Sequence, residues 1–315
     1  MSSYAVFNYQ FAKIIRRAEE GHLFPDEGIE ADEAFAKRQE ILDEIISRDF
    51  LGKELIQFKS LYSGDKVFIH RYVVPPTDHI VILRLANKRT TTIVTKDLKE
   101  KEEDDYPNSI VIIDNRPGIQ RILIESKKTA FTDVRQVARI LMYTFSLALA
   151  QYHLEFALMH LQDPRAFWTL VNDRRNYPTG FYKITFHLPH LNLERLRKVF
   201  DKVLVMSREV FDSDLEWSYK AQKGGSLPLD EKNPYQKELI EWLMKDIGSE
   251  NIKIYSNEDK RKAIVVGRDS FYTVGISNST INRLTEEALN TGLFGSAALD
   301  EIKRKTKTGI NLMLE

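Results

Sequence analysis

The chain has 315 residues, of which 43% are hydrophobic and 29% charged, and its 46 basic residues balance its 46 acidic residues. This apolar content and zero net charge exclude a disordered chain, and the absence of cysteine excludes disulfides, thiolate metal sites and cysteine nucleophiles. No run reaches the roughly 20 apolar residues of a membrane helix, and no secretory signal is visible. We therefore expect a cytoplasmic protein without membrane insertion.

The first hundred residues predict a strand, a helix and an antiparallel meander. Aromatic and β-branched residues at 4–11 indicate the strand, and apolar residues at helical spacing over 30–49 indicate the helix. Alternating runs separated by turn residues then predict four short strands, at 55–62, 66–74, 79–85 and 90–94. The stretch 96–105 is nearly all charged, which predicts an exposed, mobile loop.

The middle of the chain predicts a hairpin and two helices. Strands at 109–114 and 120–125 flank an Asn-Arg-Pro-Gly turn, and Asp133 then caps a long apolar helix. After a strand at 151–161, Asp163 and Pro164 supply the cap and first residue of a short helix.

The last part of the chain repeats the mixture of strands and helices. Strands are predicted at 180–188, 251–255, 262–266 and 271–276. Helices are predicted at 192–211, 234–247 and 279–289, with a flexible loop at 220–233 and a basic tail at 301–307. The fold class is therefore α+β, with two units of mostly antiparallel sheet and packed helices, joined by the short helix after Asp163. We place the two domains at 1–172 and 173–315.

Common catalytic motifs are missing from the sequence. It contains no P-loop, no Gly-x-Gly-x-x-Gly and no Gly-x-Ser-x-Gly, and its seven histidines form no His-x-x-x-His pair. These absences argue against a P-loop ATPase, a dinucleotide-binding enzyme, an α/β-hydrolase and a zinc site on a helix.

One acidic pattern resembles the core of the PD-(D/E)xK nucleases. Asp114 ends one strand, and Glu125 and Lys127 follow on the next strand, before a helix. The resemblance implies that Asp114 and Glu125 would hold Mg²⁺ and that Lys127 would act on the attacked phosphate.

The spacing within a hairpin opposes this nuclease interpretation. Asp114 lies at the turn and Glu125 at the far end, so we expect the carboxylates to stand well over ~10 Å apart. The helix also lacks the Gln-x-x-x-Tyr of that family. The simpler interpretation is a plain hairpin with no catalytic residue, metal or cofactor, in which D114A and E125A remove no metal chemistry.

Basic residues interleave with aromatic ones, which suits phosphate contacts combined with base stacking. The candidate nucleic-acid-binding residues are Lys127, Lys128, Arg135, Arg139, Arg174, Arg175, Arg195 and Arg197. The alternative is that these side chains only solvate helix faces. If they bind, the expected partner is nucleic acid, with DNA favoured.

The succession of strands and helices over residues 109–190 is similar to phage-exclusion and defence proteins of the RexA type, and more distantly to the DNA-binding protein RdgC. That resemblance consists of hydrophobic positions, and it implies an oligomeric, cytoplasmic DNA-binding protein of bacterial antiviral defence.

The sequence leaves three alternative functions open. The first is a non-catalytic nucleic-acid-binding protein in phage defence, and the second is a Mg²⁺-dependent nuclease. The third is a scaffold or interaction subunit of a defence complex, as a homo-oligomer or through a protein partner docked on the acidic stretch 19–44.

Overall fold

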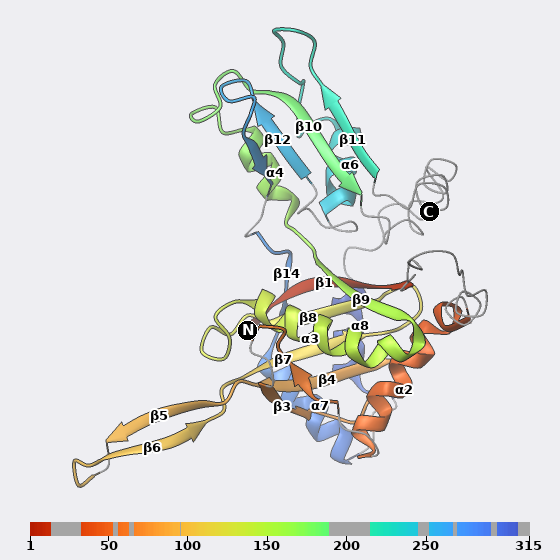
Figure 1. Cartoon of the computed structure of the whole chain (residues 1–315), viewed down its shortest axis with the longest axis vertical. Helices are drawn as coiled ribbons and strands as arrows, with labels where there is room; N and C mark the ends of the chain where they lie inside the picture. The colour runs from red at the N-terminus through yellow and green to blue at the C-terminus, as the bar shows by residue number, and fades with distance from the viewer. Residues whose placement is uncertain are drawn as a thin grey trace, which may run out of the picture. The chain divides into compact units, whose positions relative to one another are not determined.

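The computed structural model describes residues 1–13, 33–52, 56–62, 66–94, 96–188, 215–244, 252–266, 270–290 and 295–307. The chain forms two compact units (Figure 1). Unit 1 combines Met1–Leu158 with Val274–Thr308, and unit 2 contains Met159–Thr273. The mixed α+β fold with antiparallel sheets is confirmed.

Unit 1 is built on an eight-stranded sheet with the order β14–β1–β8–β7–β4–β3–β2, in which β9 also pairs with β1. All pairs from β1 to β2 along this order are antiparallel. The strands are β1 (Ser2–Lys13), β2 (Phe58–Lys59), β3 (Val67–Tyr72), β4 (Ile80–Ala86), β7 (Asn108–Asp114), β8 (Arg121–Glu125), β9 (Leu154–His160) and β14 (Thr273–Ile276). The predicted meander is confirmed for its first three strands, and the 109–125 hairpin is confirmed. The fourth predicted strand, at 90–94, forms but lies in a separate two-stranded sheet.

Helices cover both faces of this sheet, which explains its continuous apolar runs. Helix α3 (Val134–Leu149) lies on one face, and α7 (Asn278–Asn290) and α8 (Ala297–Lys307) lie on the other (Figure 1). The stretches Ile110–Ile113 and Ile122–Ile124 are buried without alternation because neither face of β7 or β8 meets water. Helix α2 (Arg38–Phe50) and the 3₁₀ turn η1 (Ala150–Tyr152) complete the described helices of unit 1.

The charged stretch 96–105 corrects the sequence-based expectation of a loop. Strand β6 (Glu100–Asp105) pairs antiparallel with β5 (Arg89–Val94), and the ribbon projects from unit 1 (Figure 1). Strand propensity disfavours such acidic residues, but here each one faces a threonine, valine or arginine of β5. The predicted exposure is confirmed, while the predicted absence of structure is wrong.

Unit 2 is a four-stranded antiparallel sheet with two helices on one face. The strand order is β11–β10–β12–β13. Its elements are α4 (Pro164–Val171), β10 (Phe181–Leu188), β11 (Leu215–Lys220), α6 (Pro234–Trp242), β12 (Ile252–Ser256) and β13 (Ala263–Val265). Phe167 and Trp168 of α4 pack with Ile184 and Phe186 of β10 in one core. Because α4 belongs to this core, the expected boundary at 172/173 lies inside unit 2.

Besides β6, two further described elements were not expected from the sequence. Strand β11 follows a stretch without clear alternation, and α8 was read only as a basic tail. The predicted helix 192–211 lies outside the described residues. No helix in the described ranges is long and apolar enough to cross a membrane.

Candidate nucleic-acid interface

Three loops meet at one end of the unit 2 sheet, which is drawn at the top of Figure 1. They are 172–180 before β10, 221–229 after β11, and 257–262 between β12 and β13. The antiparallel order brings them together, because β10 begins where β11 and β12 end.

Hydrogen bonds join the three loops into one structure. The Asn257 side-chain nitrogen donates to the backbone oxygens of Thr179 at 3.0 Å and Gly225 at 3.4 Å. The backbone N–H and hydroxyl of Thr179 donate to Glu258 Oε1 at 2.9 and 2.5 Å. These bonds lower the pKa of Glu258 to about 2, because they stabilise the ionised carboxylate. The loop end is thereby held by contacts across all three connections.

Lysine and arginine side chains dominate this loop end. Eight of them form what we call the basic loop cluster: Arg174, Arg175, Lys183, Lys220, Lys223, Lys260, Arg261 and Lys262. Seven are exposed and Lys183 is half-buried. Within the described residues, none of the eight forms an ion pair with a carboxylate. The cluster therefore keeps its positive charge for a partner in solution.

The three carboxylates in the same loops are engaged locally. Asp173 accepts from the backbone and side chain of Asn176 at 3.1 and 2.7 Å, and Glu258 binds Thr179. Asp259 accepts from the backbone N–H groups of Arg261 and Lys262 at 3.1 and 3.3 Å. Each of the three acids therefore has hydrogen bonds within its own loop end, and none forms an ion pair with a cation of the cluster.

Two tyrosines lie among these cations. Lys183 Nζ lies 5.2 Å from the ring centre of Tyr255, and Lys260 Nζ lies 5.4 Å from that of Tyr182. The two rings meet edge to face at 6.1 Å, and the Tyr182 hydroxyl donates to the Lys260 backbone oxygen at 2.8 Å. This arrangement places aromatic surface beside cationic groups, as in proteins that contact both phosphates and bases.

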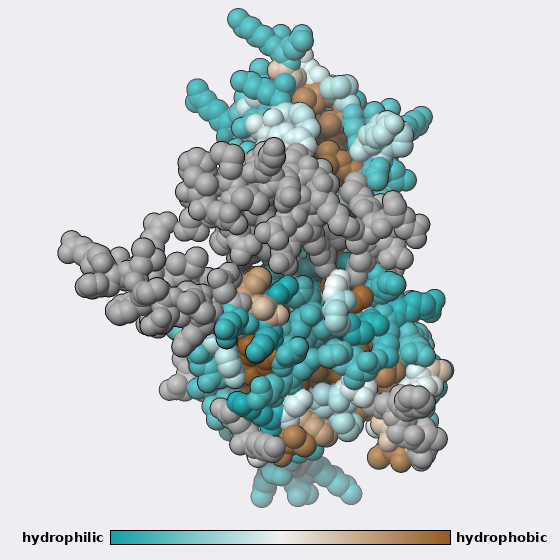
Figure 2. Space-filling model, turned by 90° about the vertical axis from the view of Figure 1, so that its right-hand side faces the viewer, coloured by the Kyte–Doolittle hydropathy of each residue, from teal (hydrophilic) through white to brown (hydrophobic). Residues whose placement is uncertain are grey.

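The helix side of unit 2 carries a different surface. Figure 2 shows apolar surface bordered by hydrophilic side chains on this unit. An apolar groove of about 290 Å³ runs here, and no charged side chain lines it among the described residues. Its walls include Trp168 and Phe186, with the exposed Tyr235 on α6. Unlike the loop end, this groove therefore offers no cation to an anionic ligand.

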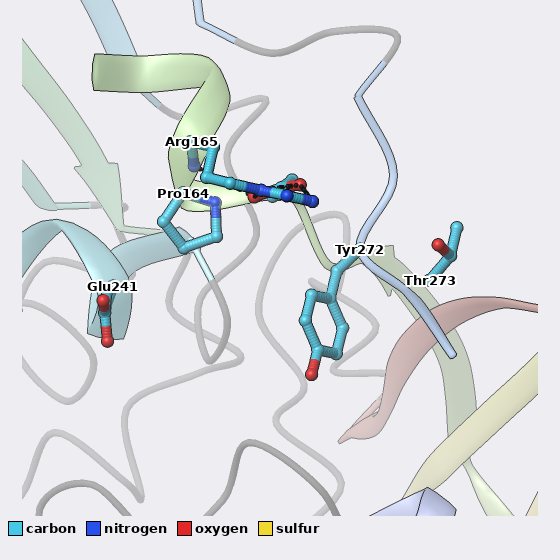
Figure 3. A pocket seen from close by; sticks show the side chains of 6 residues that line it. Pro164, Arg165, Glu241, Tyr272 and Thr273 are labelled. Atoms are coloured by element: carbon cyan, nitrogen blue, oxygen red, sulfur yellow. Dashed lines mark hydrogen bonds and ion pairs between the residues drawn. The ribbon is translucent and has the colours of Figure 1, made fainter. Parts of the chain in front are cut away.

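A polar pocket of about 280 Å³ lies at the start of α4 (Figure 3). Arg165 extends over it, but its guanidinium is held by Asp163 at 2.5–3.0 Å. Glu241 of α6 and Tyr272 also line the pocket. With two carboxylates and a neutralised arginine, this pocket does not favour an anion.

The predicted cations are divided between the two units. Lys127, Lys128 and Arg139 are exposed in unit 1, and Arg139 lies 5.7 Å from the Tyr62 ring. Arg135 binds Asp133, the cap of α3, at 2.5 and 2.9 Å, so its charge is largely neutralised. Arg174 and Arg175 belong to the basic loop cluster. Arg195 and Arg197 lie outside the described residues.

The nuclease residues are not brought together by the structure. The hairpin register places Asp114 opposite Arg121 and Val111 opposite Ile124, so Glu125 lies four residues along the strand from Asp114. Four residues correspond to about 13 Å. Lys127 is exposed beyond the strand. In the described ranges, no three His, Asp or Glu side chains are grouped to hold a metal ion.

Asp114 and Glu125 each have a structural role instead. Asp114 is fully buried and accepts from Arg116 Nε at 2.9 Å and Nη2 at 2.7 Å, which raises the pKa of Arg116. The Thr306 hydroxyl of α8 contacts the same carboxylate. Glu125 accepts from the backbone N–H of Ile110 at 3.1 Å. These contacts fit the plain hairpin.

Sequence reasoning missed most of the basic loop cluster, although a signal was present. In β10 and β12, apolar residues alternate with Lys183, Lys253 and Tyr255, so one face of each strand is polar. The run Asp259-Lys-Arg-Lys then marks a basic turn. Placing the turn cations beside those strand ends requires the strand order, which the sequence does not supply.

Compared with protein-family models, curated proteins and solved structures, the chain matches none of them.

Proposed function

We propose that this protein is a non-catalytic, cytoplasmic DNA-binding protein that holds the phosphate backbone with the basic loop cluster of unit 2. The observation that carries the proposal is the convergence of eight cations, without ion pairs among the described residues, at one end of the sheet: six lie on the three hydrogen-bonded loops, and Lys183 and Lys220 lie on the adjoining strands. Such a surface binds phosphates through charge and releases counterions, largely without regard to base sequence. Tyr182 and Tyr255 would add contacts to unstacked bases.

Salt-dependent binding tests the proposal directly. Labelled duplex and single-stranded DNA are titrated at several salt concentrations, and anisotropy gives the affinity. We expect K260A/R261A/K262A to lower the affinity roughly 100-fold and to flatten the slope of log K against log salt by about two to three.

The matched control removes the same number of cations from another exposed site. Lys96, Lys99 and Lys101 belong to the β5–β6 ribbon, where acidic residues predominate. K96A/K99A/K101A should leave the affinity within about twofold, because the acidic residues around those lysines repel the DNA phosphates. An equal loss in both triple variants, or no binding by the unaltered protein at low salt, would contradict the proposal.

We further propose that DNA binding serves bacterial antiviral defence. The residue pattern of 109–190, similar to phage-exclusion proteins, supports this setting. Cells expressing the protein should plate phage less efficiently than cells with empty vector, and K260A/R261A/K262A should restore plating. Equal plating by all three strains would remove the defence role while leaving the binding proposal intact.

A further inference from the structure

The β5–β6 ribbon stands apart from the rest of unit 1. It forms its own two-stranded sheet, and every described residue from 88 to 105 is exposed (Figure 1). Exposed apolar side chains include Val94 at 64% and Leu98 at 86%. Two-stranded ribbons are marginally stable in water, and a third or fourth strand stabilises them.

The two edges of this ribbon differ in chemistry. Strand β6 carries five carboxylates and one lysine in six residues, and charged edges of this kind discourage pairing with another chain. Strand β5 has one charged residue, Arg89, followed by five β-branched residues, Thr-Thr-Thr-Ile-Val. No third strand pairs with it in the described part of the chain. The charged β6 edge of the ribbon is therefore protected against further pairing. The β5 edge is open and has high strand propensity.

We propose that the open edge of β5 pairs with β5 of a second copy of this chain, antiparallel and about a two-fold axis. The edge is complementary to itself, because it carries no acidic residue and its single cation lies at one end. Two acidic β6 edges would repel one another, so β5 is the edge that two copies can share.

Symmetry and side-chain pairing select the register. An antiparallel pair about a two-fold axis requires one residue to face its own copy. Centring on Thr92 sets Thr92 opposite the partner's Thr92, Thr91 opposite the partner's Ile93 and Thr90 opposite the partner's Val94. All five β-branched residues then pair with one another, whereas centring on Thr91 would set Arg89 against an isoleucine.

The resulting sheet has four strands in the order β6–β5–β5–β6. The acidic β6 strands form both outer edges, at positions where charge stops further strand addition. The assembly therefore closes as a dimer and does not continue as a fibre.

Single-cysteine variants test the register, because the natural chain contains no cysteine. At the two-fold axis, the two Cα atoms of residue 92 would lie ~4.5–5.5 Å apart, within disulfide range. Under mild oxidation, T92C should run as a covalent dimer on a non-reducing gel. E102C is the control, since Glu102 faces Thr92 within the ribbon and its copies would be three strand spacings, about 14 Å, apart. Equal cross-linking of both variants, or none in T92C, overturns the register.

Light scattering tests the dimer itself. The natural protein should be a dimer at micromolar concentration, and T92K should raise the dimer Kd at least about tenfold, since it opposes two like charges. Circular dichroism should show that T92K keeps its fold. A natural protein that is monomeric at tens of micromolar, or a dimer insensitive to T92K, overturns the proposal.

Discussion

The loops of the basic loop cluster and the other described parts of the chain treat the same short sequence, Asp-x-Arg, in opposite ways. It occurs five times in the chain. At Asp114, Asp133 and Asp163, the carboxylate accepts both the backbone N–H and the guanidinium of the arginine two residues later. At Asp173 and Asp259, both in the loops of the basic loop cluster, the arginine side chain forms no ion pair.

The two aspartates in the cluster loops make other contacts. Asp173 binds the Asn176 side chain, and Asp259 caps a turn through the N–H groups of Arg261 and Lys262. Their arginines are left to solvent. The count of arginines in a sequence therefore does not show which of them keep their charge: Asp133 and Asp163 each hold the arginine two residues later, whereas Arg175 and Arg261 form no ion pair within the described residues.

The largest effect on stability is expected at Asp114, whose carboxylate is buried in its ion pair with Arg116. D114A leaves Arg116 and Thr306 without their shared acceptor, in a place where Asp114 has no exposed surface. We expect a loss of about 3 kcal/mol in the free energy of unfolding, measured by urea denaturation. E125A should cost about 1 kcal/mol, because it removes one hydrogen bond at a half-buried site. Similar stability in the two variants would contradict the structural role of Asp114.

The second prediction compares arginines of the same motif. R175A/R261A removes two unpaired cations from the basic loop cluster, whereas R135A/R165A removes two arginines held by their aspartates. We expect the first variant to lower DNA affinity about tenfold and the second to change it less than about twofold. The reverse order would show that DNA approaches the helix starts instead.

The third prediction concerns the cap of α3. The Asp133 side chain accepts from the Arg135 N–H at 2.8 Å and from its guanidinium, which lowers the pKa of Asp133. D133A should destabilise the protein by about 1 kcal/mol in thermal unfolding while leaving DNA binding unchanged. D133N, which retains a capping oxygen, should recover part of this loss. Full stability in D133A would mean that the cap contributes nothing.

The smallest effect is confined to acid pH. Because the pKa of Glu258 is lowered to about 2 from its usual 4.5, its contribution to folding is present above pH 4.5 and is lost as the pH falls towards 2. T179V removes the hydroxyl donor, so the Glu258 pKa should rise towards its ordinary value in an NMR titration. Neutral-pH stability should hardly change. A titration midpoint near 4.5 in the natural protein would contradict the loop contact.

Signals between neighbouring residues predicted most of the helices and strands. The candidate site was harder to predict, because it depends on pairing between strands that are far apart in the sequence. Two helix starts were predicted from Asp133 and from Asp163 with Pro164, because capping depends on neighbouring residues alone. The acidic β6 was missed because its strand is stabilised by pairing with β5 rather than by its own propensity. Arg174 and Arg175 were identified, but their neighbours Lys220 and Lys260 lie 45 or more residues away and meet them only through sheet order. The strand separation of Asp114 and Glu125, by contrast, follows from hairpin geometry and was predicted.

The contact between Asp114 and Thr306 joins residues 192 positions apart, and it constrains the order in which the chain can fold during its synthesis. During synthesis, the β7–β8 hairpin leaves the ribosome long before α8 exists to cover it, so its apolar face and the Asp114 carboxylate lack their final partners. Unit 2, from Met159 to Thr273, emerges in between and can fold first. Unit 1 therefore closes last, when the returning helices reach the sheet. During that interval, the uncovered apolar face of the hairpin is the surface most exposed to aggregation.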